Sequence, residues 1–162
     1  MNNQKNHGGY LIALTLLVTL ILSIVPLPIM LKAYRPDWTL LVLLYWALAL
    51  PHRVNVGVAW VCGFLLDVLL GTVLGIHALS CAIVVYVAGS NYQRIRNFSV
   101  WQQALVVGLL LALHHLLVYW FSHFLSSTYF LPEYLYPVIP GIVLWPWLFL
   151  LLRRYRRQFN IK

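Results

Sequence analysis

Acidic side chains are scarce in this chain of 162 residues, which holds three Asp and Glu residues against eleven Lys and Arg residues. Charged residues of both signs make up only 9% of the chain, and hydrophobic residues make up 62%. A soluble domain carries about 25% charged residues. Because so few charges could not cover a surface in water, the composition excludes an ordinary soluble domain and predicts an all-α integral membrane protein.

The shortage of acidic groups also argues against several kinds of active site. Hydrolysis by carboxylates needs an acidic pair, and three acids scattered along the chain make such a pair hard to build. The sequence has no Walker pattern and no glycine-rich phosphate loop after a strand. His114, His115 and His123 lack metal-ligand spacing, since adjacent helical residues point about 100° apart. We therefore predict no catalytic residue, no metal and no cofactor.

Cysteine is equally rare. Cys62 and Cys81 both fall in apolar segments, so we interpret them as small core residues and not as a disulfide. No repeat, low-complexity stretch or linker divides the sequence, and residues 1–162 are predicted to form a single transmembrane domain. The net charge of +8 is explained by membrane topology, so nucleic acid is not expected as a partner.

Apolar segments are abundant, and prolines, glycines and basic residues separate them. A helix needs roughly 20 residues to cross the hydrocarbon core of a bilayer. We predict a bundle of about six transmembrane helices near residues 9–25, 38–50, 56–74, 75–89, 103–121 and 135–152. The first ends at Pro26 and Pro28 without a small-x-small cleavage site, so we expect it to be retained.

The second segment, residues 38–50, is unusually short and would rise only about 20 Å as a helix. Either the bilayer thins around it while Arg53 snorkels, or the second and third segments form a re-entrant hairpin. The hairpin would carry Arg53 toward the bilayer centre at a high cost. Full crossing is therefore the preferred interpretation.

Basic residues are distributed unequally between alternate loops, and this predicts the orientation of the chain. One set contains Lys5, Arg53, Arg94, Arg96, Arg153, Arg154, Arg156, Arg157 and Lys162. The other set contains Lys32 and Arg35. The positive-inside rule therefore places both termini in the cytoplasm. The four tail arginines at 153, 154, 156 and 157 are expected to anchor the last helix on anionic lipid, at about 1 kcal/mol each.

Asp67 is the only acidic residue within a predicted span. A charged group there is costly unless it is paired, hydrated or protonated, so it must face protein or water. Gly63, Asp67, Gly71 and Gly75 recur every four residues, and such a stripe of small residues lets another helix approach closely. Two interpretations stay open for this stripe: a binding or partner-recognition site, and packing within the chain.

Two histidines, His114 and His115, lie near the middle of the fifth predicted helix. Counted from the cytoplasmic side, His114 and Asp67 both lie about 17 Å deep. We therefore hypothesise a hydrogen bond between Asp67 and either His114 or His115. The alternative is that both histidines bond to the backbone or to other side chains.

Several motifs, taken in order, resemble the bacterial rod shape-determining membrane protein family MreD, in its proteobacterial form. They are residues 34–38 (YRPDW), 43–46 (LLYW), 50–57 (LPHRVNVG), 63–67 (GFLLD) with Gly71 and Gly75, 101–107 (WQQALVV) and 144–147 (LWPW). The likeness runs from about residue 34 to residue 159. The two histidines at 114 and 115 are not part of it.

The resemblance implies a fold similar to the substrate-binding subunits of energy-coupling-factor vitamin transporters. It also implies a non-catalytic inner-membrane scaffold of the cell-wall elongation machinery, which maintains rod shape with MreC, the MreB filament and cell-wall synthases. Such a scaffold would contact membrane lipid and the transmembrane helix of MreC. The stripe of Gly63, Asp67 and Gly71 is the candidate for either that contact or a central pocket, and a homodimer stays open. The alternatives are a substrate-binding subunit of a vitamin-type transporter and an intramembrane enzyme that depends on Asp67.

Overall fold

The computed structural model describes residues 3–127 and 129–161. Within these residues the chain forms α-helices and two short 3-10 segments, and no strand. The elements are α1 (Asn3–Leu22), η1 (Ile29–Tyr34), α2 (Trp38–Ala49), α3 (Val56–Leu70), α4 (Ile76–Ser90), α5 (Tyr92–Asn97), α6 (Val100–Leu125), η2 (Pro132–Leu135) and α7 (Val138–Gln158). The all-α class is confirmed, and the six longer helices coincide with the predicted spans. The short α5 lies in the basic connection between the fourth and fifth predicted spans.

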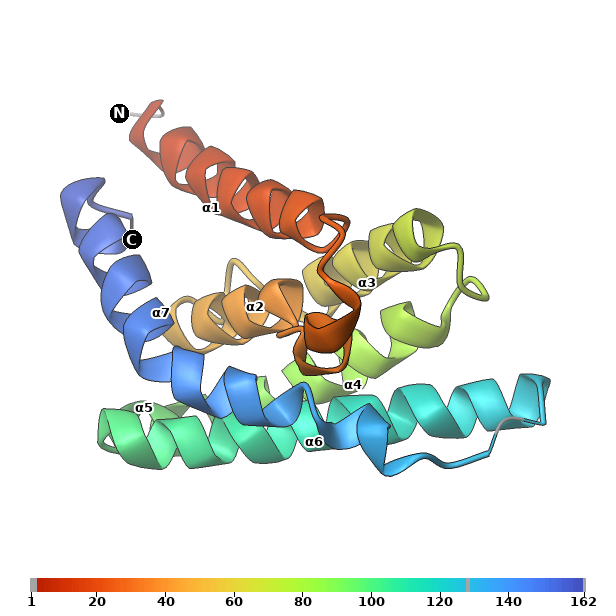
Figure 1. Cartoon of the computed structure of the whole chain (residues 1–162). Helices are drawn as coiled ribbons and strands as arrows, with labels where there is room; N and C mark the ends of the chain where they lie inside the picture. Colours follow the sequence, from red (N-terminus) through yellow and green to blue (C-terminus); the bar gives the residue numbers. More distant parts are fainter. Residues whose placement is uncertain (1–2, 128, 162) are drawn as a thin grey trace.

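Helix α2 lies in the middle of the bundle, with α1 on one side and α6 and α7 on the other (Figure 1). Every residue from Thr39 to Leu48 is buried. Its Trp46 indole donates a hydrogen bond to Thr15 of α1, at 3.0 Å. A helix that is apolar on all sides belongs in a core. Because protein encloses α2, its twelve residues need not match the thickness of the bilayer, which accounts for the short second segment.

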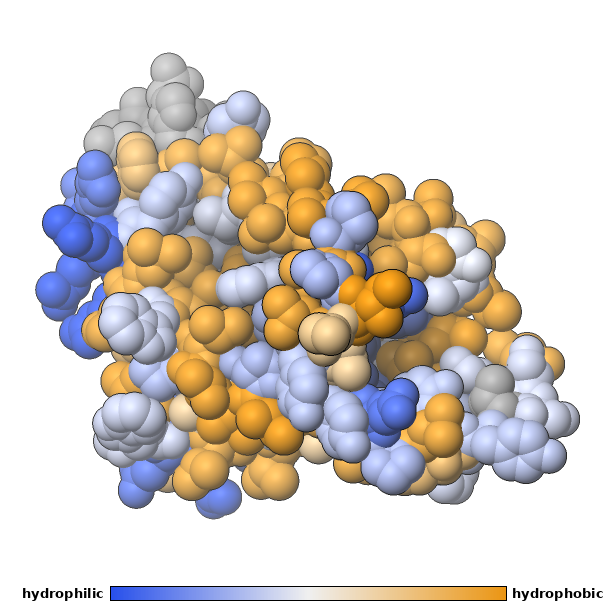
Figure 2. Space-filling view, viewed as in Figure 1, coloured by the Kyte–Doolittle hydropathy of each residue, from blue (hydrophilic) through white to orange (hydrophobic). Residues whose placement is uncertain are grey.

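Apolar side chains cover much of the outer surface of the bundle, as expected of a protein that faces lipid (Figure 2). Examples are Leu17 on α1, Val68 on α3, Leu109 on α6 and Trp147 on α7, all of which are exposed. By length and composition, α6 and residues Pro132–Gln158 could each cross a membrane, and Gly8–Leu22, α3 and α4 are shorter apolar helices. The exposed apolar surface and these apolar helices together indicate a helical membrane protein.

Local sequence signals fix several helix ends. Helix α6 begins at a capping box, in which Ser99 and Gln102 each accept a hydrogen bond from the other's backbone N–H. Helix α3 begins where the Asn55 side chain accepts from the Val58 N–H, at 3.2 Å. Helix α7 contains Pro146 and changes direction along its length (Figure 1), because proline removes one helical hydrogen bond and clashes with the preceding turn.

Candidate functional site

The Asp67 carboxylate is fully buried in the last turn of α3 and ties that helix to the start of α4. It accepts hydrogen bonds from the hydroxyl of Thr72 at 2.8 Å and from the backbone N–H groups of Gly75 at 2.9 Å, His77 at 3.1 Å and Ala78 at 3.3 Å. The His77 ring Nδ1 lies 2.8 Å from the same carboxylate. Asp67 therefore satisfies the free N–H groups of the first turn of α4, where a negative charge is also favoured by the helix dipole.

The turn between α3 and α4 depends on two glycines. Gly71 has φ +65° and Gly75 has φ +103°. Residues other than glycine rarely adopt such positive φ angles. Both residues therefore leave the helical stripe, and the prediction that they pack one helix face against another was wrong. The four-residue spacing continues past the end of α3, where the backbone has already turned.

Gly63 lies at the closest approach of α3 and α4. A Cβ placed on Gly63 would come within 2.5 Å of the His77 carbonyl oxygen and 2.6 Å of the Ala78 Cα. Gly63 and Asp67 thus face α4 of the same chain, and packing within the chain is the interpretation that the structure supports. The expected contact of this stripe with a partner helix stays a prediction; at Gly63 the facing helix is α4 of the same chain.

Three histidines and a second carboxylate extend the polar cluster away from Asp67. The ring centroids of His77 and His114 are 5.9 Å apart, and those of His114 and His115 are 5.5 Å apart. His115 Nε2 lies 2.8 Å from Asp37 Oδ2, within ion-pair distance but outside hydrogen-bond geometry. We call the five residues Asp67, His77, His114, His115 and Asp37 the polar row.

The hypothesised hydrogen bond of Asp67 to His114 or His115 was wrong, because His77 takes that place and His115 pairs with Asp37. His114 is buried, and its Nδ1 has no hydrogen-bond partner among the described residues. His77 was not singled out from the sequence. The sequence does contain a clue to its role. His77 follows Asp67 by ten residues across a glycine-containing turn, and this turn brings the start of α4 back to the end of α3.

A cavity of about 100 Å³ lies beside the polar row, and its walls include Arg35, Asp37, Thr39, His77 and His114. The pKa of the Asp37 carboxyl is lowered to about 2: burial acts to raise this pKa, and the charge and contact of His115 outweigh it. The row thus places three imidazole rings, which can accept or donate protons, between two carboxylates. Within residues 3–127 and 129–161, no three His, Cys, Asp or Glu side chains are placed to hold a metal ion.

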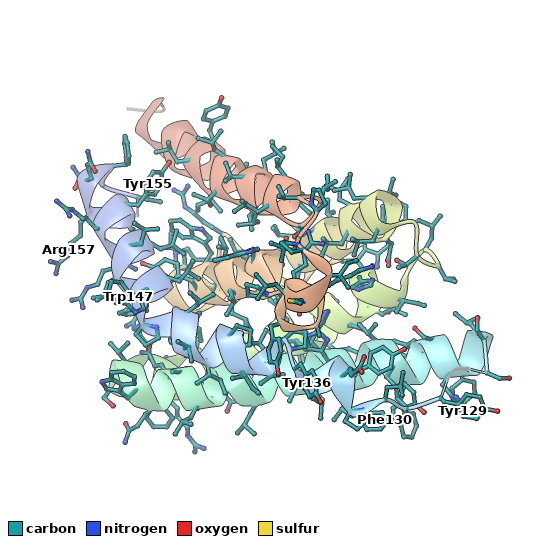
Figure 3. The ribbon with its side chains drawn as sticks, viewed as in Figure 1. Tyr129, Phe130, Tyr136, Trp147, Tyr155 and Arg157 are labelled. Atoms are coloured by element: carbon teal, nitrogen blue, oxygen red, sulfur yellow. The ribbon has the colours of Figure 1, made fainter. Side chains whose placement is uncertain are left out.

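The four tail arginines lie in the last turns of α7, at the other end of the bundle, and they do not share one environment. Arg153 and Arg156 line a cavity together with Arg96 of α5. Arg154 borders a groove between α1 and α7, and Arg157 extends away from the bundle (Figure 3). The four arginines therefore form two pairs: Arg153 and Arg156 line a cavity, whereas Arg154 and Arg157 lie outside it.

Comparisons with a protein family and with a curated relative both point to the same family. The chain matches the family described as rod shape-determining protein MreD over residues 4–155. It is 35% identical over 144 residues to the Rod shape-determining protein MreD of Haemophilus influenzae, an alignment that covers 89% of each chain. No solved structure matches the chain significantly.

Proposed function

Since this chain belongs to the MreD family of rod shape-determining proteins, we propose that it is a non-catalytic scaffold of the cell-wall elongation machinery. In this role it lies in the bacterial inner membrane and acts with MreC, the MreB filament and cell-wall synthases. The family match over residues 4–155 carries the proposal, because it includes α2 to α6 entirely and most of α1 and α7.

The proposed topology is multi-pass, with both termini in the cytoplasm. The beginning of α1 and the end of α7 lie at the same end of the bundle in Figure 1. Hydrophilic residues gather around this end, over α5 and the last turns of α7 (Figure 2), where Arg94, Arg96 and the tail arginines lie. Reporter fusions at both termini test this: activity of a periplasmic reporter at either end would contradict the proposal.

The surface proposed for the MreC helix is the groove between α1 and α7. It has a volume of about 460 Å³, and its walls are mainly apolar, with Leu14 and Val18 from α1 and Leu148 and Leu151 from α7. Val42 of the core helix α2 also lines it. Apolar walls formed by two diverging helices suit a third helix, which associates in lipid through close packing.

The groove is lined by residues 14–22 of α1 and 148–158 of α7. One end is bordered by Leu22 and Trp38, at the last residue of α1 and the first of α2. The other end is bordered by Arg154 and Gln158, at the end of α7. The groove thus reaches from the last residue of α1 to the basic end of α7, and a single helix packed along it would contact both.

Filling the groove tests the proposed partner. Val18→Trp and Leu151→Trp each place an indole at an exposed groove position, so we expect both to reduce copurification of MreC and to make cells that depend on this copy round. Leu109→Trp is the matched control, because Leu109 is 73% exposed on α6 and does not line the groove. Normal MreC recovery and rod shape with both groove variants would refute this surface.

A further inference from the structure

A cavity of about 210 Å³ lies at the basic end of the bundle, between α2, α5, α6 and α7. This volume is well above the roughly 30 Å³ that one water molecule occupies in the liquid. Three arginines border it: Arg96 from α5, and Arg153 and Arg156 from α7. The salt bridges found among the described residues involve only histidines as bases, so no acidic side chain there neutralises these arginines.

Gln103 of α6 brings a buried acceptor to the cavity. Its side-chain Nε2 donates to the carbonyl oxygens of Ile95 at 3.1 Å and Phe98 at 3.3 Å, at the end of α5. These bonds fix the orientation of the amide. The Oε1 atom is therefore the free acceptor, and it is buried without a hydrogen-bond partner in the described part of the chain.

Trp145 of α7 brings a buried donor to the same cavity. Its side chain is fully buried, and its indole Nε1 has no partner among the residues that the structure describes. Unpaired buried polar groups are rare because they have lost their bonds to water. Gln103 and Trp145 line one cavity with three arginines, and each carries a buried polar atom without a partner, which points to a ligand that supplies the missing bonds.

We propose that this cavity binds the phosphate group of a hydroxyl-bearing phosphate ester. Guanidinium groups match the geometry of phosphate oxygens and bind them through paired hydrogen bonds. The Trp145 N–H suits another phosphate oxygen, and the Gln103 Oε1 suits a neighbouring hydroxyl. Binding in this cavity would therefore be specific, unlike the general attraction of the tail arginines to the membrane surface.

The surroundings of the cavity favour a lipid headgroup as the source of the phosphate. Tyr45, Leu48 and Phe149 provide apolar and aromatic walls beside the arginines. The cavity also lies where the apolar part of α7 gives way to its basic end, which is the level of headgroups for a helix that crosses the membrane. Phosphatidylglycerol carries both a phosphate and hydroxyl groups, so it is the lipid used in the test.

The test compares two double variants of the full chain in detergent, with lipid binding measured by native mass spectrometry. Arg96→Gln with Arg153→Gln removes one cavity arginine from α5 and one from α7. Arg94→Gln with Arg157→Gln removes the same charge from the same two helices, outside the cavity. We expect phosphatidylglycerol affinity to fall at least about tenfold in the cavity variant and less than about twofold in the control. Equal losses in both variants would overturn the proposal.

A second measurement follows the Trp145 indole itself. The 15N-indole signal of Trp145, assigned by its absence in Trp145→Phe, is expected to shift on titration with phosphatidylglycerol and to stay in place with phosphatidylcholine. Glycerol 3-phosphate distinguishes the two sources of phosphate: if it produces the same shift and displaces the lipid, the ligand is a soluble ester, and if it does neither, the ligand is a lipid. Absence of a shift with both phosphatidylglycerol and glycerol 3-phosphate would overturn the proposal.

Discussion

His77 of α4 meets Asp67 of α3 through both its ring and its backbone: the ring Nδ1 lies 2.8 Å and the backbone nitrogen 3.1 Å from Asp67 Oδ1. Two groups of one residue thus converge on a single carboxylate oxygen. The backbone N–H groups of Gly75 and Ala78 bind the other oxygen. The end of α3 and the start of α4 are therefore held by one side chain, and removing its charge should loosen the hairpin.

The Asp67→Asn substitution is expected to lower the free energy of unfolding by about 1.5–3 kcal/mol, because an amide nitrogen replaces an oxygen that accepts from backbone N–H groups. Thermal unfolding in detergent measures the change. His77→Gln is the comparison, since it removes the ring contact and keeps the backbone bonds, and it should cost less. An Asp67→Asn protein as stable as the original would show that the carboxylate does not hold the hairpin.

Gly63→Ala is expected to destabilise the bundle by about 1–3 kcal/mol, the usual cost of forcing extra atoms into a packed interface. The added Cβ would meet backbone atoms of His77 and Ala78, which cannot turn aside as a side chain would. Gly89→Ala is the matched control, because nothing lies within 4 Å of its Cβ position and alanine favours a helix by roughly 0.5–1 kcal/mol. Equal melting temperatures for the two variants would contradict the close approach of α3 and α4.

Gly71 should tolerate asparagine better than alanine. Its φ of +65° and ψ of +28° place it in the left-handed region, which costs an ordinary L-residue roughly 1–2 kcal/mol, whereas asparagine visits this region more readily. No other atom lies within 4 Å of the Cβ position, so backbone strain alone sets the difference. Unfolding measurements should rank the native chain first, Gly71→Asn second and Gly71→Ala third, and the reverse order of the two variants would argue against this turn.

The positions of the helices could be predicted from the sequence because prolines and charges mark where apolar segments stop. The enclosure of α2 could not, since its residues are as apolar as those of lipid-facing helices. Whether such a helix meets lipid or protein depends on how the other helices pack around it. Burial from Thr39 to Leu48 is thus a property of the whole bundle and not of this segment.

The polar row shows that the depth of a residue along its helix is not enough to predict which side chain it contacts. Asp67 and His114 were placed at one level, and His114 indeed lies near the Asp67 partner, with its ring 5.9 Å from that of His77. The direct partner of Asp67 comes instead from the turn, whose path is set by the positive φ angles of Gly71 and Gly75. A four-residue repeat does not reveal that the helix ends partway through it.

The division of the tail arginines into two pairs can be seen in their spacing along the sequence. Arg153 and Arg156 are three residues apart on α7, as are Arg154 and Arg157, so each pair shares one side of the helix. The structure places the first pair at the cavity with Arg96. Helical spacing therefore separates the two pairs, although it does not reveal that α5 brings a third arginine to the first.

The central position of α2 has a consequence for how the protein is made. This helix leaves the ribosome second, yet four of the helices that surround it, α4, α5, α6 and α7, are synthesised later. Until they arrive, α2 can be shielded only by α1 and by lipid, so the bundle closes after translation of the last helix. A chain cut short at its carboxyl end would leave this helix of twelve residues in contact with a bilayer that it is too short to cross.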